Sequence, residues 1–106
     1  MIEQHLNEMY SLALENGITP FLCTIPPSKS FTKPDQVLEL NNWIRKKAMQ
    51  KHLPFIDLYH VLDNPSKSGT LNPEYDSGDG THPNNEGYKL MANKIYKRMN
   101  LYNNDF

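Results

Sequence analysis

Two short, nearly continuous apolar runs, residues 18–25 and 54–59, constrain the fold of this chain more than any other feature. Runs of this length and composition are typical of strands that are covered on both faces in a parallel sheet. A segment with helical spacing of apolar residues, 35–51, lies between them. Two strands joined through a helix form a right-handed parallel crossover. The sequence therefore predicts an α/β layered fold.

Three segments carry apolar residues at the spacing of an amphipathic helix. They predict helices over residues 2–16, 35–51 and 85–99. The apolar stripes of these helices are expected to face the interior. They consist of Ile2, Leu6, Met9 and Ala13, then Val37, Leu40, Ile44 and Ala48, and finally Tyr88, Met91, Ala92, Ile95 and Met99.

Local signals mark the ends of these helices. Gly17 follows the first helix and favours the left-handed turn with which many helices end. Asp35 and Asn84 are expected to cap the starts of the second and third helices. Residues 63–80 are rich in Asn, Pro, Ser, Gly and Asp and are predicted to form a long loop, whereas residues 100–106 are expected to fray.

The predicted sheet is too narrow for the helices around it. Two parallel strands cannot cover three amphipathic helices, and parallel sheets are normally buried on both faces. The chain of 106 residues is at most one domain, and its 24 Leu, Ile, Val and Phe residues supply only a modest core. We therefore expect the second half of a doubly wound sheet, whose exposed edge offers a place for a second copy or a partner chain to pair.

Composition excludes several classes of function. The net charge is −1, with 11 basic and 12 acidic residues, so the basic footprint of a nucleic-acid-binding protein is absent. The apolar runs are far shorter than a membrane span of roughly 18 residues requires, and no secretory leader is recognised at the start. The single cysteine, Cys23, excludes an intrachain disulfide and is expected to be a small apolar core residue. A single cysteine does not indicate in which cellular compartment the protein works.

The chemistry-bearing segment is residues 79–88, where Asp79 precedes His82 by three positions in a loop. Gly80 lets the backbone turn tightly between them. Pro83 keeps His82 out of the helical region, so the imidazole is expected at the rim of the fold. A carboxylate at that distance can accept the Nδ1–H of the ring and leave Nε2 free to take a proton from a nucleophile.

This segment, D-G-T-H-P-N-x-E-G-Y, resembles the last conserved block of the SGNH (GDSL-like) hydrolases. The upstream stretches M-x-x-L-A-x-E-N-G-I, L-N-N-W-I-R and P-F-I-D-L-Y are also similar to that family. The resemblance implies a flavodoxin-like, three-layer α/β/α fold with a five-stranded parallel sheet. It implies that residues 1–106 are a partial domain, the C-terminal half of such a hydrolase.

The family comprises serine esterases and acylhydrolases, and the match puts Asp79 and His82 at the positions of its triad acid and base. By this resemblance His82 is general base and then general acid, and Asp79 orients it. The resemblance also implies an ester substrate, such as an acetylated carbohydrate or another short acyl ester, and it implies no cofactor or metal. The family's G-D-S and G-x-N-D motifs are missing, and the serines present, none of them in the nucleophile's context, are Ser11, Ser28, Ser30, Ser66, Ser68 and Ser77. We therefore expect the isolated chain to be inactive or incomplete.

A metal site is a rival interpretation of Asp76, Asp79, His82 and Glu86. Glycines occupy the alternate positions at which a Ca²⁺ loop needs Asp or Asn, and no second histidine follows His82 at the spacing of a helical zinc pair. Turn formation explains these residues better. The remaining histidines have no motif around them and are expected to be exposed or capping: His5, His52 and His60.

Other interpretations use the same residues differently. Asp79 and His82 can be a turn-capping aspartate beside a surface histidine. Ser28 and Ser30 follow the first strand and are conceivable substitute nucleophiles, although loop solvation explains them more simply. Trp43 is interpreted as a packing residue. The chain can also be a non-catalytic remnant that pairs through its sheet edge, or a small metal-dependent loop protein.

Overall fold

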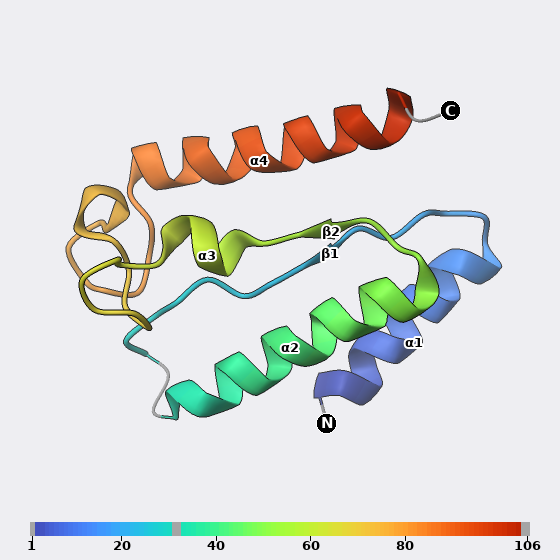
Figure 1. Ribbon diagram of the computed structural model, residues 1–106, viewed down its shortest axis with the longest axis horizontal. Helices are drawn as coiled ribbons and strands as arrows, with labels where there is room; N and C mark the ends of the chain where they lie inside the picture. Colours follow the sequence, from blue (N-terminus) through green and yellow to red (C-terminus); the bar gives the residue numbers. More distant parts are fainter. Residues whose placement is uncertain (1, 31–32, 105–106) are drawn as a thin grey trace.

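The computed structural model describes residues 2–30 and 33–104 (Figure 1). Two short strands and four helices follow one another with a single 3₁₀ turn near the third helix. In chain order they are α1 (Ile2–Glu15), β1 (Leu22–Cys23), α2 (Pro34–Lys51), β2 (Phe55–Ile56), α3 (Leu58–Leu62), the 3₁₀ helix η1 (Pro73–Tyr75) and α4 (Asn85–Asn104).

The two strands form a parallel pair at the centre of the molecule. Leu22 lies opposite Phe55 and Cys23 opposite Ile56. The helices α1 and α2 lie on one side of this pair and α4 lies on the other, which gives three layers (Figure 1). The predicted α/β architecture with a parallel crossover through a helix is confirmed.

The strands are shorter than the apolar runs that predicted them, 18–25 and 54–59. Each has two residues in the ladder, because a strand with one neighbour is held on one side only and Pro20 and Pro26 have no N–H to donate. The second run ends early because Asp57 caps α3: its Oδ1 accepts a hydrogen bond from the His60 N–H at 3.0 Å.

The predicted helices are present with adjusted ends. Gly17 adopts a φ of +74° and ends α1 as expected. Asp35 does not cap α2; it lies in the first turn, and Lys33 is the capping position, without a side-chain hydrogen bond. Asn84 does cap α4, since its Oδ1 accepts the Gly87 N–H at 2.9 Å. The expected fraying of 100–106 is wrong for residues up to Asn104, which are helical, and 105–106 lie outside the described residues.

The core lies between α2 and the strands. The predicted stripe of α2 is fully confirmed, because Val37, Leu40, Ile44 and Ala48 are all buried. Leu62 of α3 is completely inaccessible to solvent. The other buried hydrophobic residues are Tyr10, Ile56, Leu58 and Leu71.

The outer helices are much less covered than their stripes predicted. In α1, Ile2 and Met9 are 59% and 66% exposed. Between residues 85 and 102 of α4 only Gly87 is buried, whereas Tyr88 and Met99 are exposed. The reason is the width of the sheet, because two strands cannot cover a helix on each face. None of the described helices is long and apolar enough to span a membrane.

Candidate active site

Asp79 and His82 are in direct contact. The imidazole Nδ1 lies 2.7 Å from Asp79 Oδ2, the geometry of an N–H donated to a carboxylate. The His82 and Asp79 side chains are 68% and 51% exposed, so the pair lies on the surface. Within the described part of the chain, His82 Nε2 makes no hydrogen bond. The ring is therefore oriented by one nitrogen and open at the other.

The carboxylate of Asp79 is held by several donors at once. Its Oδ1 accepts the backbone N–H groups of Thr81 and His82, each at 2.8 Å, and the Ser77 hydroxyl at 3.2 Å. The hydrogen bond from the His82 side chain, followed by those from the backbone N–H groups, lowers the pKa of Asp79 well below its ordinary range. Asp79 is thus an ionised acceptor that fixes both the imidazole and the turn carrying it.

The loop that presents this pair is built around Asp76. The Asp76 Oδ1 accepts the N–H groups of Gly78 at 2.8 Å and Gly80 at 3.0 Å. Both glycines have positive φ values, +118° and +74°, which other residues rarely adopt. The loop closes where the Ser77 N–H donates to the His82 carbonyl at 3.0 Å. The last part of the long loop predicted over residues 63–80 is therefore a tightly hydrogen-bonded turn.

The segment after β1 contacts this turn directly. The Lys29 N–H donates to the Gly80 carbonyl at 3.0 Å. A Cβ added at Gly80 would lie 2.6 Å from Lys29 Cδ, so the lysine stem covers the glycine closely. This contact between distant parts of the sequence brings the carboxyl end of β1 next to His82.

Two further residues of the D-G-T-H-P-N-x-E-G-Y block support the start of α4. The Asn84 side-chain amide donates to the carbonyls of Glu74 at 3.0 Å and Asp76 at 3.3 Å. Gly87 packs so closely that an added Cβ would lie 2.9 Å from both Pro83 Cβ and the Tyr75 carbonyl oxygen. The sequence reasoning identified Asn84 as a cap but missed Gly87, whose signal is a glycine inside the first turn of an amphipathic helix.

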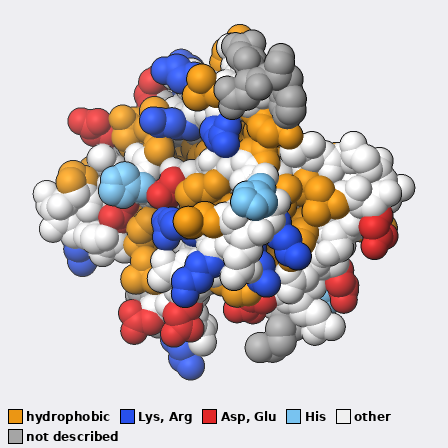
Figure 2. Space-filling view, turned by 45° about the vertical axis from the view of Figure 1, so that its right-hand side comes forward, with side chains coloured by type: hydrophobic (Ala, Val, Ile, Leu, Met, Phe, Trp, Pro, Cys, Tyr) orange, Lys and Arg blue, Asp and Glu red, His pale blue; other side chains and the backbone are white. Residues whose placement is uncertain are grey.

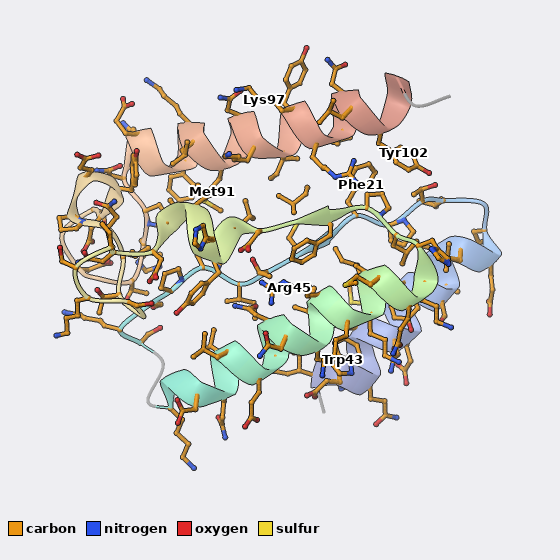
Figure 3. The ribbon with its side chains drawn as sticks, viewed as in Figure 1. Phe21, Trp43, Arg45, Met91, Lys97 and Tyr102 are labelled. Carbon is orange, nitrogen blue, oxygen red and sulfur yellow. The ribbon has the colours of Figure 1, made fainter. Side chains whose placement is uncertain are left out.

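A groove of about 350 Å³ runs beside His82. It is bordered on one side by residues 25–27 and on the other by Tyr88 and Met91 of α4; Figure 3 labels Met91 on this helix. Ser28 and Ser30 line it too, with their hydroxyl oxygens 2.7 Å apart. The structure therefore brings the two serines into the groove of His82 but hydrogen-bonds them to each other.

The acidic residues considered above as metal ligands bind protein groups instead. The Asp76 carboxylate accepts from its own loop, and Glu86 pairs with Lys89 at 3.3 Å. Among residues 2–30 and 33–104, no group of three or more His, Cys, Asp or Glu side chains is arranged to hold a metal ion.

The other residues that the sequence singled out as possible functional residues lie away from His82. His5 Nδ1 lies 4.0 Å from Glu8 Oε2 on α1, and His52 ends α2 with a φ of +55°. Cys23 is half-buried, and burial raises the pKa of its thiol, which disfavours the thiolate that a nucleophile needs. Trp43 lines an apolar groove between α1 and α2, away from the pair.

Comparison with known proteins extends these observations. The family described as GDSL-like Lipase/Acylhydrolase matches residues 1–90. No curated protein matches the chain. Among solved structures, the chain is similar to a candidate acylhydrolase from Bacteroides fragilis, with 32% identity over 92% of this chain and a TM-score of 0.83. It is also similar to a GDSL-like lipase from Bacteroides thetaiotaomicron, with 28% identity over 92% of this chain and a TM-score of 0.83.

These relatives are about twice as long. The chain spans 49% of the first structure and 50% of the second. A candidate lipolytic protein of the G-D-S-L family from Desulfitobacterium hafniense is 25% identical over 91% of this chain, with a TM-score of 0.78, and 53% of its length is covered.

Proposed function

The chain belongs to the GDSL-like lipase/acylhydrolase family, and we propose that it carries the acid and base of a serine esterase site, with His82 as the proton-transferring residue and Asp79 as its orienting carboxylate. The observation that carries this proposal is the 2.7 Å contact between His82 Nδ1 and Asp79 Oδ2, with Nε2 unengaged at the rim of a groove. The same arrangement orients the base in serine hydrolases in general.

The proposed reaction uses a single nitrogen of the imidazole, Nε2, for every proton transfer, while Nδ1 stays bonded to Asp79. His82 Nε2 takes the proton of a serine hydroxyl as the serine oxygen attacks the ester carbonyl carbon. The tetrahedral intermediate then collapses, the C–O bond to the alcohol breaks, and Nε2 returns its proton to the departing alcohol. The same nitrogen then takes a proton from water as the water oxygen attacks the acyl carbon, and it returns that proton to the serine oxygen as the bond between the acyl carbon and the serine breaks, which releases the carboxylic acid. Asp79 stabilises the imidazolium at each stage and keeps the ring in place.

The serine is proposed to lie outside residues 1–106. No G-D-S or G-x-N-D motif occurs in the chain, and the serine hydroxyls that line the groove, those of Ser28 and Ser30, are bonded to each other. The chain spans only about half of its matched structures. We therefore propose that these residues are the C-terminal half of an SGNH domain and that nucleophile and oxyanion donors come from the other half.

The groove supports a small ester as substrate. Its walls include the apolar side chains of Ile25, Pro26, Pro27 and Met91, while His82 and Thr81 provide the polar edge. A small groove with apolar walls favours a short acyl group, such as the acetyl group of an acetylated carbohydrate.

A covalent chimera tests the chemistry directly. Residues 1–106 replace the matched half of the Bacteroides thetaiotaomicron GDSL-like lipase, and hydrolysis of p-nitrophenyl acetate is measured. We expect turnover that His82→Ala reduces about 10⁵-fold or more and Asp79→Asn about 10³- to 10⁴-fold. The 106-residue chain alone is expected to show no turnover that depends on His82. A folded chimera that hydrolyses the ester equally well with and without His82 would refute the proposal.

A further inference from the structure

A cationic groove borders the outer side of β2, and we call it the β2 groove. Its volume is about 440 Å³, and it is lined by β2 and residues of α3 on one side and by α4 on the other. No residue of β1 lines it, and none of its lining residues lines the groove of His82. Lys and Arg side chains gather among hydrophobic side chains on the face shown in Figure 2. The β2 groove is therefore separate from the candidate active site.

The positive charge of the β2 groove comes from one face of α4. Lys94, Lys97 and Arg98 line the groove and have the i, i+3 and i+4 spacing that places side chains on the same side of a helix. None of the three forms an ion pair with a described residue. Residues 87–104 contain four basic residues and no acidic one, although the net charge of the chain is −1. The groove thus carries three cations whose charge no neighbouring carboxylate neutralises.

The one acidic residue among those that line the β2 groove is already bonded. Asp57 Oδ2 lies 3.4 Å from Arg45 Nη2. Its Oδ1 accepts hydrogen bonds from the Thr24 hydroxyl and the His60 N–H, each at 3.0 Å. Arg45 extends from α2 toward the sheet, and its guanidinium carbon lies 5.4 Å from the centre of the Phe55 ring (Figure 3). Asp57 is therefore not available to neutralise the cations of α4.

The strand side of the β2 groove offers main-chain hydrogen bonds. The Leu22 N–H donates to the Pro54 carbonyl at 2.9 Å, and the Thr24 N–H donates to the Ile56 carbonyl at 3.0 Å. Main-chain groups of successive strand residues point to opposite edges of the strand, so the N–H and C=O of Phe55 point away from β1. Within the described residues no third strand pairs with them. The outer edge of β2 therefore has an unpaired donor and acceptor beside the cations.

We infer that the β2 groove binds an acidic, extended segment of a partner protein, which adds a strand to the outer edge of β2. Strand addition of this kind uses main-chain hydrogen bonds for affinity and side-chain contacts for specificity. Carboxylates of the segment pair with the cations of α4, and its apolar atoms cover Val61 and Leu101, which also line the groove. Leu101 is 61% exposed and so has apolar surface to bury. The inference does not depend on the ester chemistry proposed for His82.

The spacing of the cations matches the spacing of side chains on a strand. The helix α4 runs along the sheet (Figure 1), and side chains three or four residues apart on a helix are separated by about 5–6 Å at Cβ. Side chains at i and i+2 of a strand lie on the same face, about 6.6–6.8 Å apart. Acidic residues at alternate positions of an added strand would therefore meet first Lys94 and then Lys97 with Arg98, or the reverse.

Charge and shape disfavour the other occupants. A second copy of this chain paired through the same edge would bring two sets of α4 cations together, and charged residues at a sheet edge oppose such pairing. A bilayer surface is flat and would not enter the groove to reach the main chain of Phe55. A small phosphate-rich ligand would pair with the cations but would leave the Phe55 main chain and Leu101 unused. An acidic polypeptide uses all three parts of the groove.

Binding of a designed peptide to the 106-residue chain tests the inference. The probe is a fluorescently labelled octapeptide of alternating glutamate and threonine, and the control peptide has glutamine in place of each glutamate. Fluorescence anisotropy gives the two affinities. We expect the glutamate peptide to bind about tenfold or more tightly than the glutamine peptide, because hydrogen bonds between ionised groups are the stronger ones.

Charge reversal locates the bound peptide. Lys97→Glu should weaken binding of the glutamate peptide about tenfold or more, because it removes a cation from the groove and adds a carboxylate that repels the peptide. Lys46→Glu is the matched control, since it makes the same change at an exposed position of α2 that does not line the β2 groove. It should change the affinity less than about twofold. Lys97 is also exposed, and circular dichroism checks that both variants are folded.

N-methylation of the peptide separates strand addition from charge attraction alone. In a bound strand alternate N–H groups point toward β2, so methylation of the glutamate nitrogens and methylation of the threonine nitrogens should have unequal effects. One methylated peptide should bind about tenfold more weakly than the other.

Four results would overturn the inference. Equal affinities of the two methylated peptides would indicate a general polyanion site, as would displacement of the peptide by an equal concentration of tripolyphosphate. Equal binding by the Lys97→Glu and Lys46→Glu variants would place the peptide elsewhere. The absence of binding at a peptide concentration of about 1 mM would leave the groove without the proposed ligand.

Discussion

Substituting Gly87 by Ala tests how tightly the His82 turn is seated on α4. Gly87 lies within the helix, where replacement by alanine normally stabilises by about 1 kcal/mol. Here the new Cβ would meet Pro83 Cβ and the Tyr75 carbonyl oxygen, each at 2.9 Å. Carbon atoms pack at about 3.5–4.0 Å, so the helix must move outward by more than half an ångström relative to the turn.

The free-energy cost of this displacement can be compared with the gain in helix propensity that the alanine brings. Overpacking of this kind costs about 1–3 kcal/mol. The movement also strains the hydrogen bond from the Asn84 N–H to the Tyr75 carbonyl, 2.8 Å long, and such a bond contributes about 0.5–1.5 kcal/mol. After subtraction of the helical gain of about 1 kcal/mol, we expect Gly87→Ala to lower the free energy of unfolding by about 0.5–3.5 kcal/mol.

Urea unfolding followed by circular dichroism measures this change. Asn93→Ala is the matched control, because Asn93 is an exposed position of the same helix and the smaller alanine adds no atom that a neighbour would have to avoid. We expect the control to be stabilised by a few tenths of a kcal/mol, about the difference in helix propensity. The close approach of α4 to the turn would be refuted if Gly87→Ala proved as stabilising as Asn93→Ala.

Three further predictions concern single groups. Folding lowers the pKa of Asp79. The contribution of the Asp79 carboxylate to stability is therefore complete above its unfolded pKa of about 3.9, and it is lost as the pH falls toward the folded pKa. NMR titration should show the lowered pKa of Asp79, and His82→Ala should raise that pKa. Leu62→Ala should cost about 2–5 kcal/mol in urea unfolding because Leu62 is fully buried, whereas Leu101→Ala, at a site 61% exposed, should cost less than about 0.5 kcal/mol. Burial raises the pKa of Cys23, so a thiol reagent should modify it more slowly than a free cysteine and should reach the free rate in urea; equal rates in both conditions would contradict the burial.

The features that could be predicted from sequence are those encoded within a few residues. The prediction of a buried apolar stripe on α2 was correct because the residues at helical spacing are the residues that are buried there. The contact between Asp79 and His82 was also foreseeable, since three residues of a tight turn bring both side chains together. Gly80 and Pro83 were informative for the same local reason.

The features that could not be predicted depend on what lies beyond the local segment. Strand length depends on a second neighbour, which β1 does not have within the described residues. The exposure of Met9 and Tyr88 depends on what covers α1 and α4, and periodicity says only which face is apolar. The contact of Lys29 with Gly80 joins segments some fifty positions apart, and no sequence pattern in either segment predicts this contact.

The central claim is that Asp79 sets the proton on one nitrogen of His82 and leaves the other as the base. Nitrogen-15 NMR of the imidazole, at a pH where the ring is neutral, reports this directly and requires no nucleophile. The account predicts a protonated Nδ1 and an unprotonated Nε2, and a mixture of the two tautomers in Asp79→Asn. A neutral His82 that carries its proton on Nε2 would contradict it.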